Sequence, residues 1–263
     1  MENSDLNEWV IAIPSYKRLN KIKSHTLALL NKHNISQNKI FIFLSDDIEY
    51  DLYKNEIGGD YNYIIGVPLI HKQRNFINHY FPVGCKIISI DDDIKEVTEL
   101  LNGNLIPIPN LPLFFTYAFE KTIELGFYIW GIYPVDNAYF MKDKISVDLK
   151  YIVGAFCGVI NRHDEDLMLD LEDKEDYLKS IQFYIKDGGV VRFNNIGIKT
   201  KYYGEGGLNL NPKERFEEGF KNVHILKKRY PEYLRVTDPK KNNFHWNIQL
   251  IKNPKINRDL NLG

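Results

Sequence analysis

Four short apolar runs, separated by longer amphipathic stretches, constrain the fold of this chain more than any other feature. They are WVIAIP at 9–14, KIFIFL at 39–44, YNYIIGV at 61–67 and CKIISI at 85–90, rich in isoleucine, valine and aromatic residues. Runs that are apolar at nearly every position are typical of strands covered on both faces. Because helical segments separate them, they predict an α/β fold with a mixed, mostly parallel sheet flanked by helices.

The intervening segments carry helical spacing. The clearest is 17–34, in which Leu19, Ile22, Leu27 and Leu30 fall on one helical face. Further along the chain, the pattern predicts helices at 72–81, 114–126, 175–189 and 212–230, strands at 127–134 and 151–162, a strand pair at 190–203, and an irregular tail from Thr237.

Composition limits the class of protein. A chain of 263 residues with 44% hydrophobic content can build one sizeable core, and we expect a single domain over 1–263. The formal net charge of -1 does not by itself indicate nucleic-acid or membrane binding, although from Lys221 onward there are 10 basic residues against 3 acidic ones. That basic stretch is either a solvated tail or a surface that meets phosphates.

Cysteine usage and hydropathy point to a protein of the cytoplasm. Cys85 and Cys157 lie in apolar runs without metal-binding spacing, which predicts reduced, buried thiols. The polar start MENSDLNE and the lack of a run of about 20 apolar residues predict neither a signal peptide nor a membrane span. We therefore expect a cytoplasmic protein with no membrane partner.

Three consecutive aspartates, Asp91, Asp92 and Asp93, follow the fourth apolar run directly. A buried strand delivers such carboxylates at the carboxyl edge of a parallel sheet, where open α/β sheets bind ligands. A hard divalent cation such as Mg²⁺ or Mn²⁺ relieves their mutual repulsion. Because alternate residues of an extended segment point the same way, Asp91 and Asp93 are predicted to face the ion and Asp92 to face elsewhere. The alternative is an acidic N-cap for a helix at 94–97.

The first two apolar runs end in polar residues at the same edge. Pro14, Ser15, Tyr16 and Arg18 close the first run, and their hydroxyls and cation suit a nucleoside and its phosphate. Asp46 follows the second run, where a carboxylate can accept a hydrogen bond from a base or ribose. Taken singly, each segment also fits ordinary turn or N-cap chemistry.

Arg74 is a further candidate for binding the nucleotide. It begins the short helical segment before the aspartates, from which its guanidinium can reach a pyrophosphate or a base near the metal. An exposed helix arginine is the alternative.

Two later segments suggest an acceptor pocket. Trp130 and Tyr133 fall at the end of a strand, where they can stack on a sugar or a base, although core packing is the alternative for at least one of them. The glycine-rich run from Gly154 to Gly158 permits a close approach of the backbone to a ligand.

In combination and in order, these motifs resemble the nucleotide-sugar half of the GT-A fold glycosyltransferases. The resemblance implies a UDP-sugar donor and a Mn²⁺ or Mg²⁺ ion, with a nucleotide-binding half at about 9–100, an acceptor half at about 101–236 and a basic tail at 237–263. It places the uridine against Pro14, Ser15, Tyr16, Arg18 and Asp46, the nucleotide also against Arg74 and Asp92, the metal on Asp91 and Asp93, and the sugar pocket around Gly158.

The resemblance extends to the catalytic base. Inverting members of the family place that base in an acidic motif at a helix start, which here is Lys174-Glu175-Asp176, with Asp173 in the rival position. We expect Asp176 first and Asp173 second, with Glu175 beside them; the alternative is that these acids only favour the helix dipole.

Two histidines that the resemblance implies, and one basic loop, complete the expected site. A C-terminal histidine, His224 or His245, is implied as a further metal ligand, with a structural role as the alternative. The basic loop with Lys201, Gly206 and Gly207 is expected to close over the diphosphate.

Within that fold, the segments PSYKR, KQRN, IDDDI, YIVGAFCGVINR, KEDY and VVRF are similar to the TET/JBP-associated, base J type DNA glycosyltransferases over roughly 9–210. This likeness implies transfer of glucose from UDP-glucose to a 5-hydroxymethylpyrimidine in DNA, often in phage or viral genomes. A glycan, protein or small-molecule acceptor is the alternative within the class. A nucleotidyltransferase and a non-catalytic nucleotide-sugar or DNA-binding module are the alternatives outside it.

Overall fold

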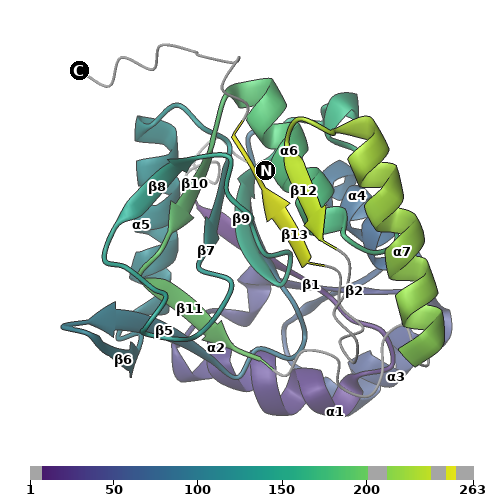
Figure 1. Ribbon diagram of the computed structural model, residues 1–263. Coiled ribbons are helices and arrows are strands. Elements are labelled where there is room, and N and C mark those ends of the chain that lie inside the picture. The colour runs from purple at the N-terminus through teal and green to yellow at the C-terminus, as the bar shows by residue number, and fades with distance from the viewer. Residues whose placement is uncertain (1–7, 201–211, 238–246, 253–263) are drawn as a thin grey trace.

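The apolar runs form the strands of one eight-stranded sheet in the computed structural model, which describes residues 8–200, 212–237 and 247–252. The order β3-β2-β1-β4-β9-β7-β10-β8 is mixed, because β9 runs antiparallel to both its neighbours and β8 antiparallel to β10 (Figure 1). The strands are β1 (Trp9–Pro14), β2 (Ile40–Leu44), β3 (Asn62–Ile65), β4 (Lys86–Ile90), β7 (Ile129–Ile132), β8 (Ile145–Asp148), β9 (Phe156–Ile160) and β10 (Val190–Phe193). The predicted α/β class is confirmed.

Helices cover both faces of this sheet. They are α1 (Leu19–Ile22), α2 (Ala28–Lys32), α3 (Asp47–Ile57), α4 (Ile70–Tyr80), α5 (Leu111–Glu124), α6 (Glu175–Asp187) and α7 (Pro212–Arg229). The main core joins residues of α1 to α3 and α5 to one face, while α4 and α6 pack on the other face in separate clusters. Each helix within the described ranges is too short or too polar to cross a lipid bilayer.

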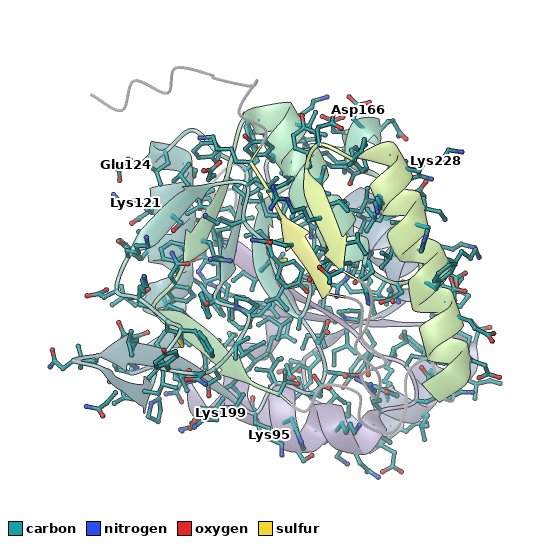
Figure 2. The ribbon with its side chains drawn as sticks, viewed as in Figure 1. Lys95, Lys121, Glu124, Asp166, Lys199 and Lys228 are labelled. Atoms are coloured by element: carbon teal, nitrogen blue, oxygen red, sulfur yellow. The ribbon has the colours of Figure 1, made fainter. Side chains whose placement is uncertain are left out.

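Two small sheets complete the fold. β11 (Ile196–Lys199), β5 (Glu96–Leu101) and β6 (Asn104–Pro107) form one, and β12 (Leu234–Thr237) pairs with β13 (Asn247–Leu250) in the other. A cluster around Leu178, Val223 and Leu234 packs α6, α7 and the second small sheet together. Charged side chains such as Lys121, Asp166 and Lys228 lie on the outside of the molecule (Figure 2).

Several local predictions were wrong. The helix expected at 17–34 is interrupted by a π-helical turn at Lys23–Leu27. The alternative helix at 94–97 does not exist, because β5 begins at Glu96. The expected strand pair at 190–203 is split between two sheets, and the tail predicted to be irregular contains β13.

Other elements were missed. Helix α3 was not predicted, since the segment after the second apolar run was interpreted only as a turn, and strands β5, β6 and β8 were not predicted either. Cys85 and Cys157 are both buried and unpaired, as predicted.

Candidate active site

The carboxyl ends of β1, β2 and β4 meet at one edge of the sheet, because the three strands are parallel and in register. Ser15 and Asp91 directly follow two of these strands and are held to their neighbours by backbone hydrogen bonds of 3.0 Å (Ser15 N to Phe43 O) and 2.9 Å (Asp91 N to Ala155 O). We call Ser15, Arg18 and Asp91 to Asp93 the strand-end group. Register alone brings these sequence-distant residues together.

Asp92 is the structural centre of the strand-end group. It is 3% exposed and accepts from the Ser15 hydroxyl at 2.6 Å and from Arg18 Nη1 at 3.1 Å. Burial raises the pKa of Asp92 to about 6, opposed by the Ser15 and Arg18 hydrogen bonds. The expectation that Asp92 points away from the ion agrees with this orientation. Its contact with the nucleotide stays a prediction, and both its oxygens already accept a hydrogen bond from the protein.

Helix α3 supports the same loop, although the sequence reading missed it. The Tyr53 hydroxyl is within 2.9 Å of Ser15 Oγ and accepts from the Arg18 amide at 2.9 Å. Glu49, one turn earlier, accepts from the Lys17 amide at 2.8 Å. Both side chains are buried, so the face of α3 that positions the loop is defined by Glu49 and Tyr53 at i and i+4.

Asp91 and Asp93 remain the candidate metal ligands. Asp91 is the more open, with a side chain 31% exposed, and its Oδ1 accepts from Arg74 Nη2 at 3.1 Å. Asp93 accepts from Thr200 Oγ1 at 2.8 Å and from Arg18 Nη1 at 3.3 Å. Burial and then the charge of Asp91 raise the pKa of Asp93. A cation placed between these carboxylates would offset that repulsion.

The donor set fits a hard cation bound together with a diphosphate. No group of three or more His, Cys, Asp or Glu residues is arranged for a metal in the described part of the chain. Mg²⁺ commonly binds through one or two carboxylates plus phosphate oxygens and water, so Asp91 and Asp93 suffice. His224 lies on α7, where Nδ1 contacts Phe220 O at 2.8 Å, and it joins no such group. His245 and Lys201 lie outside the described residues.

The π-helical turn Lys23–Leu27 supports residues 91–94, which we call the aspartate loop. Thr26 is fully buried within it, donates to the Asp91 carbonyl at 2.7 Å and accepts from the Ile94 amide at 3.0 Å. Short π-helical insertions are frequent at functional sites, where they displace one side chain from the regular helical path. Here the displaced turn places a hydroxyl against the loop that carries the carboxylates.

Arg74 connects the strand-end group to the second half of the chain. It lies in the middle of α4, is 5% exposed, and its guanidinium reaches Ser89 Oγ at 2.8 Å, Asp91 Oδ1 at 3.1 Å and Glu175 Oε1 at 3.5 Å. Burial opposes its charge, but Asp91 and Glu175 more than offset this, so its pKa lies above the ordinary value. The alternative of an exposed helix arginine is therefore wrong.

Glu175 and Asp176, which we call the helix-start pair, open α6. Asp176 accepts from the Tyr151 hydroxyl and from the Tyr177 amide, the latter at 2.9 Å. Burial raises the pKa of both carboxyls, and the charge of Asp176 adds to the effect at Glu175. The preceding Lys174 has φ +66, a left-handed conformation that costs energy in a non-glycine residue. Raised pKa values and backbone strain together are common at catalytic sites.

Asp173, the rival base, has a different environment. Its carboxylate accepts from its neighbour Lys174 Nζ at 2.7 Å and the side chain is 33% exposed. The hydroxyl of Tyr151 and the guanidinium of Arg74 contact the helix-start pair instead.

Gly154 lies beside Arg74 and the helix-start pair. A Cβ there would lie 3.1 Å from Arg74 Nη2, 3.3 Å from Glu175 Oε1 and 3.4 Å from Asp176 Cβ. These distances are tighter than most Cβ contacts, so glycine favours the close approach of the backbone to Arg74 and the helix-start pair.

Two expected acceptor residues are instead structural. Trp130 is fully buried and packs edge-on against Phe114 and Phe119, so the prediction that it stacks on a ligand is wrong. Gly158 lies under that indole, because a Cβ there would be 2.2 Å from Trp130 Cε2, so the expectation that it lines the sugar pocket is also wrong. Tyr133, directly after β7, is half-buried and keeps part of its surface open to solvent.

The remaining expected nucleotide contacts lie around the strand ends. Pro14 is buried at the end of β1, whereas Tyr16 is 40% exposed. Asp46 caps α3, accepting from the Glu49 amide at 2.9 Å and from Ser45 Oγ at 2.8 Å. A turn was the alternative that the sequence left open for Asp46, and these two hydrogen bonds use one lone pair on each carboxylate oxygen.

Comparison with solved structures shows a GT-A-like fold. No protein-family model and no curated protein matches the chain. S. aureus TarS 1-349 in complex with UDP is similar, with a TM-score of 0.50 and 15% identity, over 83% of this chain and 65% of that one. GalNAc-T7 with UDP, GalNAc and Mn²⁺ gives a TM-score of 0.53 and 10% identity, over 88% and 50%. The chain therefore spans less than two thirds of either protein.

A weaker likeness is to a CMP:2-keto-3-deoxy-manno-octonic acid synthetase complexed with CTP. Its TM-score is 0.42 with 10% identity, over 71% of this chain and 89% of that one. At these identities the comparisons show the fold alone.

Proposed function

We propose that this chain is a metal-dependent glycosyltransferase that moves a sugar from a UDP-sugar to an acceptor hydroxyl with inversion. One observation carries the proposal. Arg74 is buried between Asp91 of the strand-end group and Glu175 of the helix-start pair, with Gly154 leaving space beside them. Arg74 thus pairs with a carboxylate from each of the two groups, one suited to a metal diphosphate and one with a raised pKa.

The donor would lie along the strand ends. Tyr16, Arg18 and Asp46 border the place for the nucleoside, and Arg74 reaches toward the diphosphate. Asp91 and Asp93 would hold Mn²⁺ or Mg²⁺, which when bound neutralises charge on the departing UDP. Because Asp92 and Tyr53 fix Ser15 and Arg18 beforehand, the loop loses little freedom when the donor binds.

Asp176 is the group we assign as the base. As the acceptor oxygen forms its bond to the anomeric carbon and the sugar–phosphate bond breaks, the hydroxyl proton passes to a carboxylate oxygen of Asp176. The Tyr151 hydroxyl and the Tyr177 amide orient that carboxylate and favour its charged form before the reaction. Each oxygen keeps a lone pair for the incoming proton.

For the substrates, we propose glucose as the sugar and a 5-hydroxymethylpyrimidine in DNA as the acceptor. The support is the motif set shared with the TET/JBP-associated enzymes, above all the KEDY segment, which contains the helix-start pair. A base in duplex DNA would have to be flipped out, or the substrate would be single-stranded.

The test measures UDP release with UDP-glucose and Mn²⁺. The acceptor arms are single-stranded DNA with 5-hydroxymethylcytosine or 5-hydroxymethyluracil, the same strand unmodified, a panel of glycans and small molecules, and no acceptor. UDP release only with a hydroxymethylated strand supports both parts of the proposal. Release with a glycan or small-molecule panel, and none with DNA, rejects the DNA acceptor. No release with any acceptor rejects the transferase.

A separate sample that contains a nucleoside triphosphate, a sugar phosphate and Mg²⁺ tests a nucleotidyltransferase. Such an enzyme would convert a nucleoside triphosphate and a sugar phosphate to pyrophosphate and a nucleotide sugar. Pyrophosphate release would favour it, although the first loop, Pro14 to Arg18, lacks the glycine-rich phosphate-binding sequence expected for that reaction.

Asp176→Asn tests the base. We expect it to lower kcat by about 10²- to 10⁴-fold, since that is the range for a general base, while UDP affinity measured by calorimetry stays within a factor of about two. Asp173→Asn is the matched control, because Asp173 is the adjacent carboxylate paired with Lys174. Full activity of Asp176→Asn together with inactive Asp173→Asn would move the base to Asp173.

A further inference from the structure

Arg192, on β10, is a half-buried arginine that the proposed reaction does not use. Within the described residues, the other buried or half-buried arginines, Arg18, Arg74 and Arg162, each form an ion pair with an aspartate. Arg192 forms none with any described residue. Burial consequently lowers its pKa, with only Tyr133 acting in the other direction.

The guanidinium of Arg192 is nevertheless fixed in place. Its Nε donates to Asn194 Oδ1 at 2.9 Å, and its Cζ lies 5.1 Å from the centre of the Tyr133 ring. Asn194 is itself 3% exposed and is oriented by Nδ2, which donates to Lys144 O at 3.0 Å and to Ser146 Oγ at 2.8 Å. This arrangement uses Nε and leaves the two terminal nitrogens to present their N–H groups together.

Strand register places Arg192 on the same face of the sheet as Arg74. Arg192 is the cross-strand partner of Gly131, and Gly131 that of Cys157. Cys157 in turn lies opposite Ser89, whose hydroxyl accepts from Arg74. Cross-strand partners point to the same face, so Arg192 faces the side of the sheet that carries the helix-start pair (β9, β7 and β10 in Figure 1).

Ile152 connects this position to the proposed base. A Cβ on Gly131 would lie 2.7 Å from Ile152 Cγ2, so Ile152 packs over the strand next to Arg192. The preceding residue, Tyr151, donates to Asp176. Adjacent strands are about 4.8 Å apart. Ile152 itself is fully buried, so an acceptor whose hydroxyl meets Asp176 would reach Arg192 along the carboxyl ends of the parallel strands β7 and β10.

We infer that Arg192, held by Asn194 and Tyr133, binds an anionic group of the phosphate class carried by the acceptor. A guanidinium with two free parallel N–H groups binds such an anion in bidentate fashion, and partial burial strengthens the contact. Within the described residues no carboxylate pairs with the guanidinium, which leaves the cation available for such an anion. The assignment of the anion to the acceptor rests on the proposed function, whereas anion binding itself does not.

The first experiment measures binding without catalysis. Inorganic phosphate is titrated into the protein saturated with UDP and diamagnetic Mg²⁺, which occupy the proposed donor site, and line broadening is followed by ³¹P NMR. We expect saturable binding of phosphate to the wild type and none to Arg192→Gln. Arg192→Lys should bind at least tenfold more weakly than the wild type, because lysine keeps the charge but lacks the paired N–H donors of the guanidinium. Arg235→Gln is the matched control, because Arg235 is an exposed arginine on β12, and it should bind like the wild type.

Equal phosphate affinity in the wild type and Arg192→Gln would overturn the inference, as would absence of saturable binding to the wild type. Circular dichroism establishes that each variant is folded. If Arg192→Gln does not fold, Arg192→Lys decides by the same criterion. If UDP fails to bind, the proposed function is in doubt, and the phosphate titration is then repeated without nucleotide to judge Arg192 separately.

The second experiment identifies the source of the phosphate. UDP release is measured with 5-hydroxymethyldeoxycytidine, its 5′-monophosphate and a short single strand that contains it. We expect the KM of the phosphorylated acceptors to be about tenfold lower than that of the nucleoside, and this advantage to vanish in Arg192→Gln while the nucleoside reaction is unchanged. If only the single strand has a lower KM than the nucleoside, the site binds a phosphodiester. If the KM of the phosphorylated acceptors stays equally low in Arg192→Gln, the assignment of the anion to the acceptor is rejected.

Discussion

Tyr151 and Asp176 illustrate how single residues tune this site. Burial raises the pKa of the Asp176 carboxyl, while the Tyr151 hydroxyl and the nearby Lys174 and Arg74 charges lower it. The Tyr151 side chain is also stacked on Tyr177, with ring centroids 4.3 Å apart, so its hydroxyl has little freedom to turn away. The protonation state of the proposed base thus depends on one neighbouring hydroxyl as well as on solvent exclusion.

Tyr151→Phe should move the acidic limb of the pH–rate profile. A base acts only when deprotonated, so kcat/KM rises with pH through the apparent pKa of the helix-start pair. Removing a donor that stabilises the carboxylate raises the pKa of Asp176, and the limb shifts to higher pH. The profile of kcat/KM between pH 4 and 9 measures the shift.

Tyr63→Phe is the control for this experiment. It deletes a hydroxyl of a half-buried side chain that donates to Gly58 O at 2.7 Å. Tyr63 lies on β3, an edge strand of the large sheet. Its profile should coincide with that of the wild type. A limb that stays in place, or moves to lower pH, in Tyr151→Phe would contradict the role of the hydrogen bond.

At the scale of elements, two irregular backbone features help to position the site. The π-helical turn Lys23–Leu27 brings Thr26 against the aspartate loop, and the left-handed Lys174 sets the direction in which α6 begins. Neither feature could be predicted from hydrophobic spacing, because both depend on contacts with segments distant in sequence. Thr26 bonds to Asp91 and Ile94, 65 and 68 residues away.

Thr26→Val should weaken both stability and metal-dependent UDP binding. The substitution preserves shape but leaves the buried Ile94 amide unpaired, which costs about 1–3 kcal/mol. It also frees the Asp91 carbonyl, so we expect the affinity for UDP with Mn²⁺ to fall about tenfold, an effect of about 1.4 kcal/mol. Urea denaturation and calorimetry measure the two effects.

Thr122→Val is a close control for this change. Thr122 is also fully buried, but its hydroxyl donates only to Ala118 O within α5, at 2.6 Å. Its UDP affinity should equal that of the wild type. Unchanged nucleotide affinity in Thr26→Val would show that the aspartate loop does not need the π-helical support.

For the whole molecule, one sheet joins the two halves of the proposed site. The antiparallel strand β9 lies between β4, which leads to the aspartates, and β7, which leads to Tyr133. Buried charges cross the same boundary, since Arg74 pairs with Asp91 on one side and Glu175 on the other. Donor binding should therefore stabilise the molecule as a whole.

UDP with Mn²⁺ should raise the thermal midpoint. At a ligand concentration of 100 times Kd the stabilisation is about 2.7 kcal/mol, which corresponds to about 5–10 °C for a domain near this size. EDTA should abolish the shift, and Asp91→Asn should show almost none. Asp51→Asn, an exposed aspartate on α3, should shift like the wild type. An identical shift in EDTA would contradict the metal site; differential scanning fluorimetry provides the measurement.

The sequence by itself determined the strands that carry the strand-end group. The runs at 9–14, 39–44 and 85–90 are apolar at nearly every position, so they can only be satisfied inside a sheet covered on both faces. Their polar ends then necessarily share one edge. The proximity of Ser15 to the aspartates followed from that pattern alone, as did the burial of both cysteines.

Tertiary structure decided which of these polar residues face inward. Asp92 is held by a hydrogen bond from Ser15, 77 residues away in the sequence. Arg74 is held by an ion pair with Glu175, 101 residues away. Trp130 was indistinguishable in sequence from a binding aromatic, but α5 covers it completely. The physical reason is that burial of a charge or a ring is set by what packs over it, and the residues that do so come from elements far along the chain.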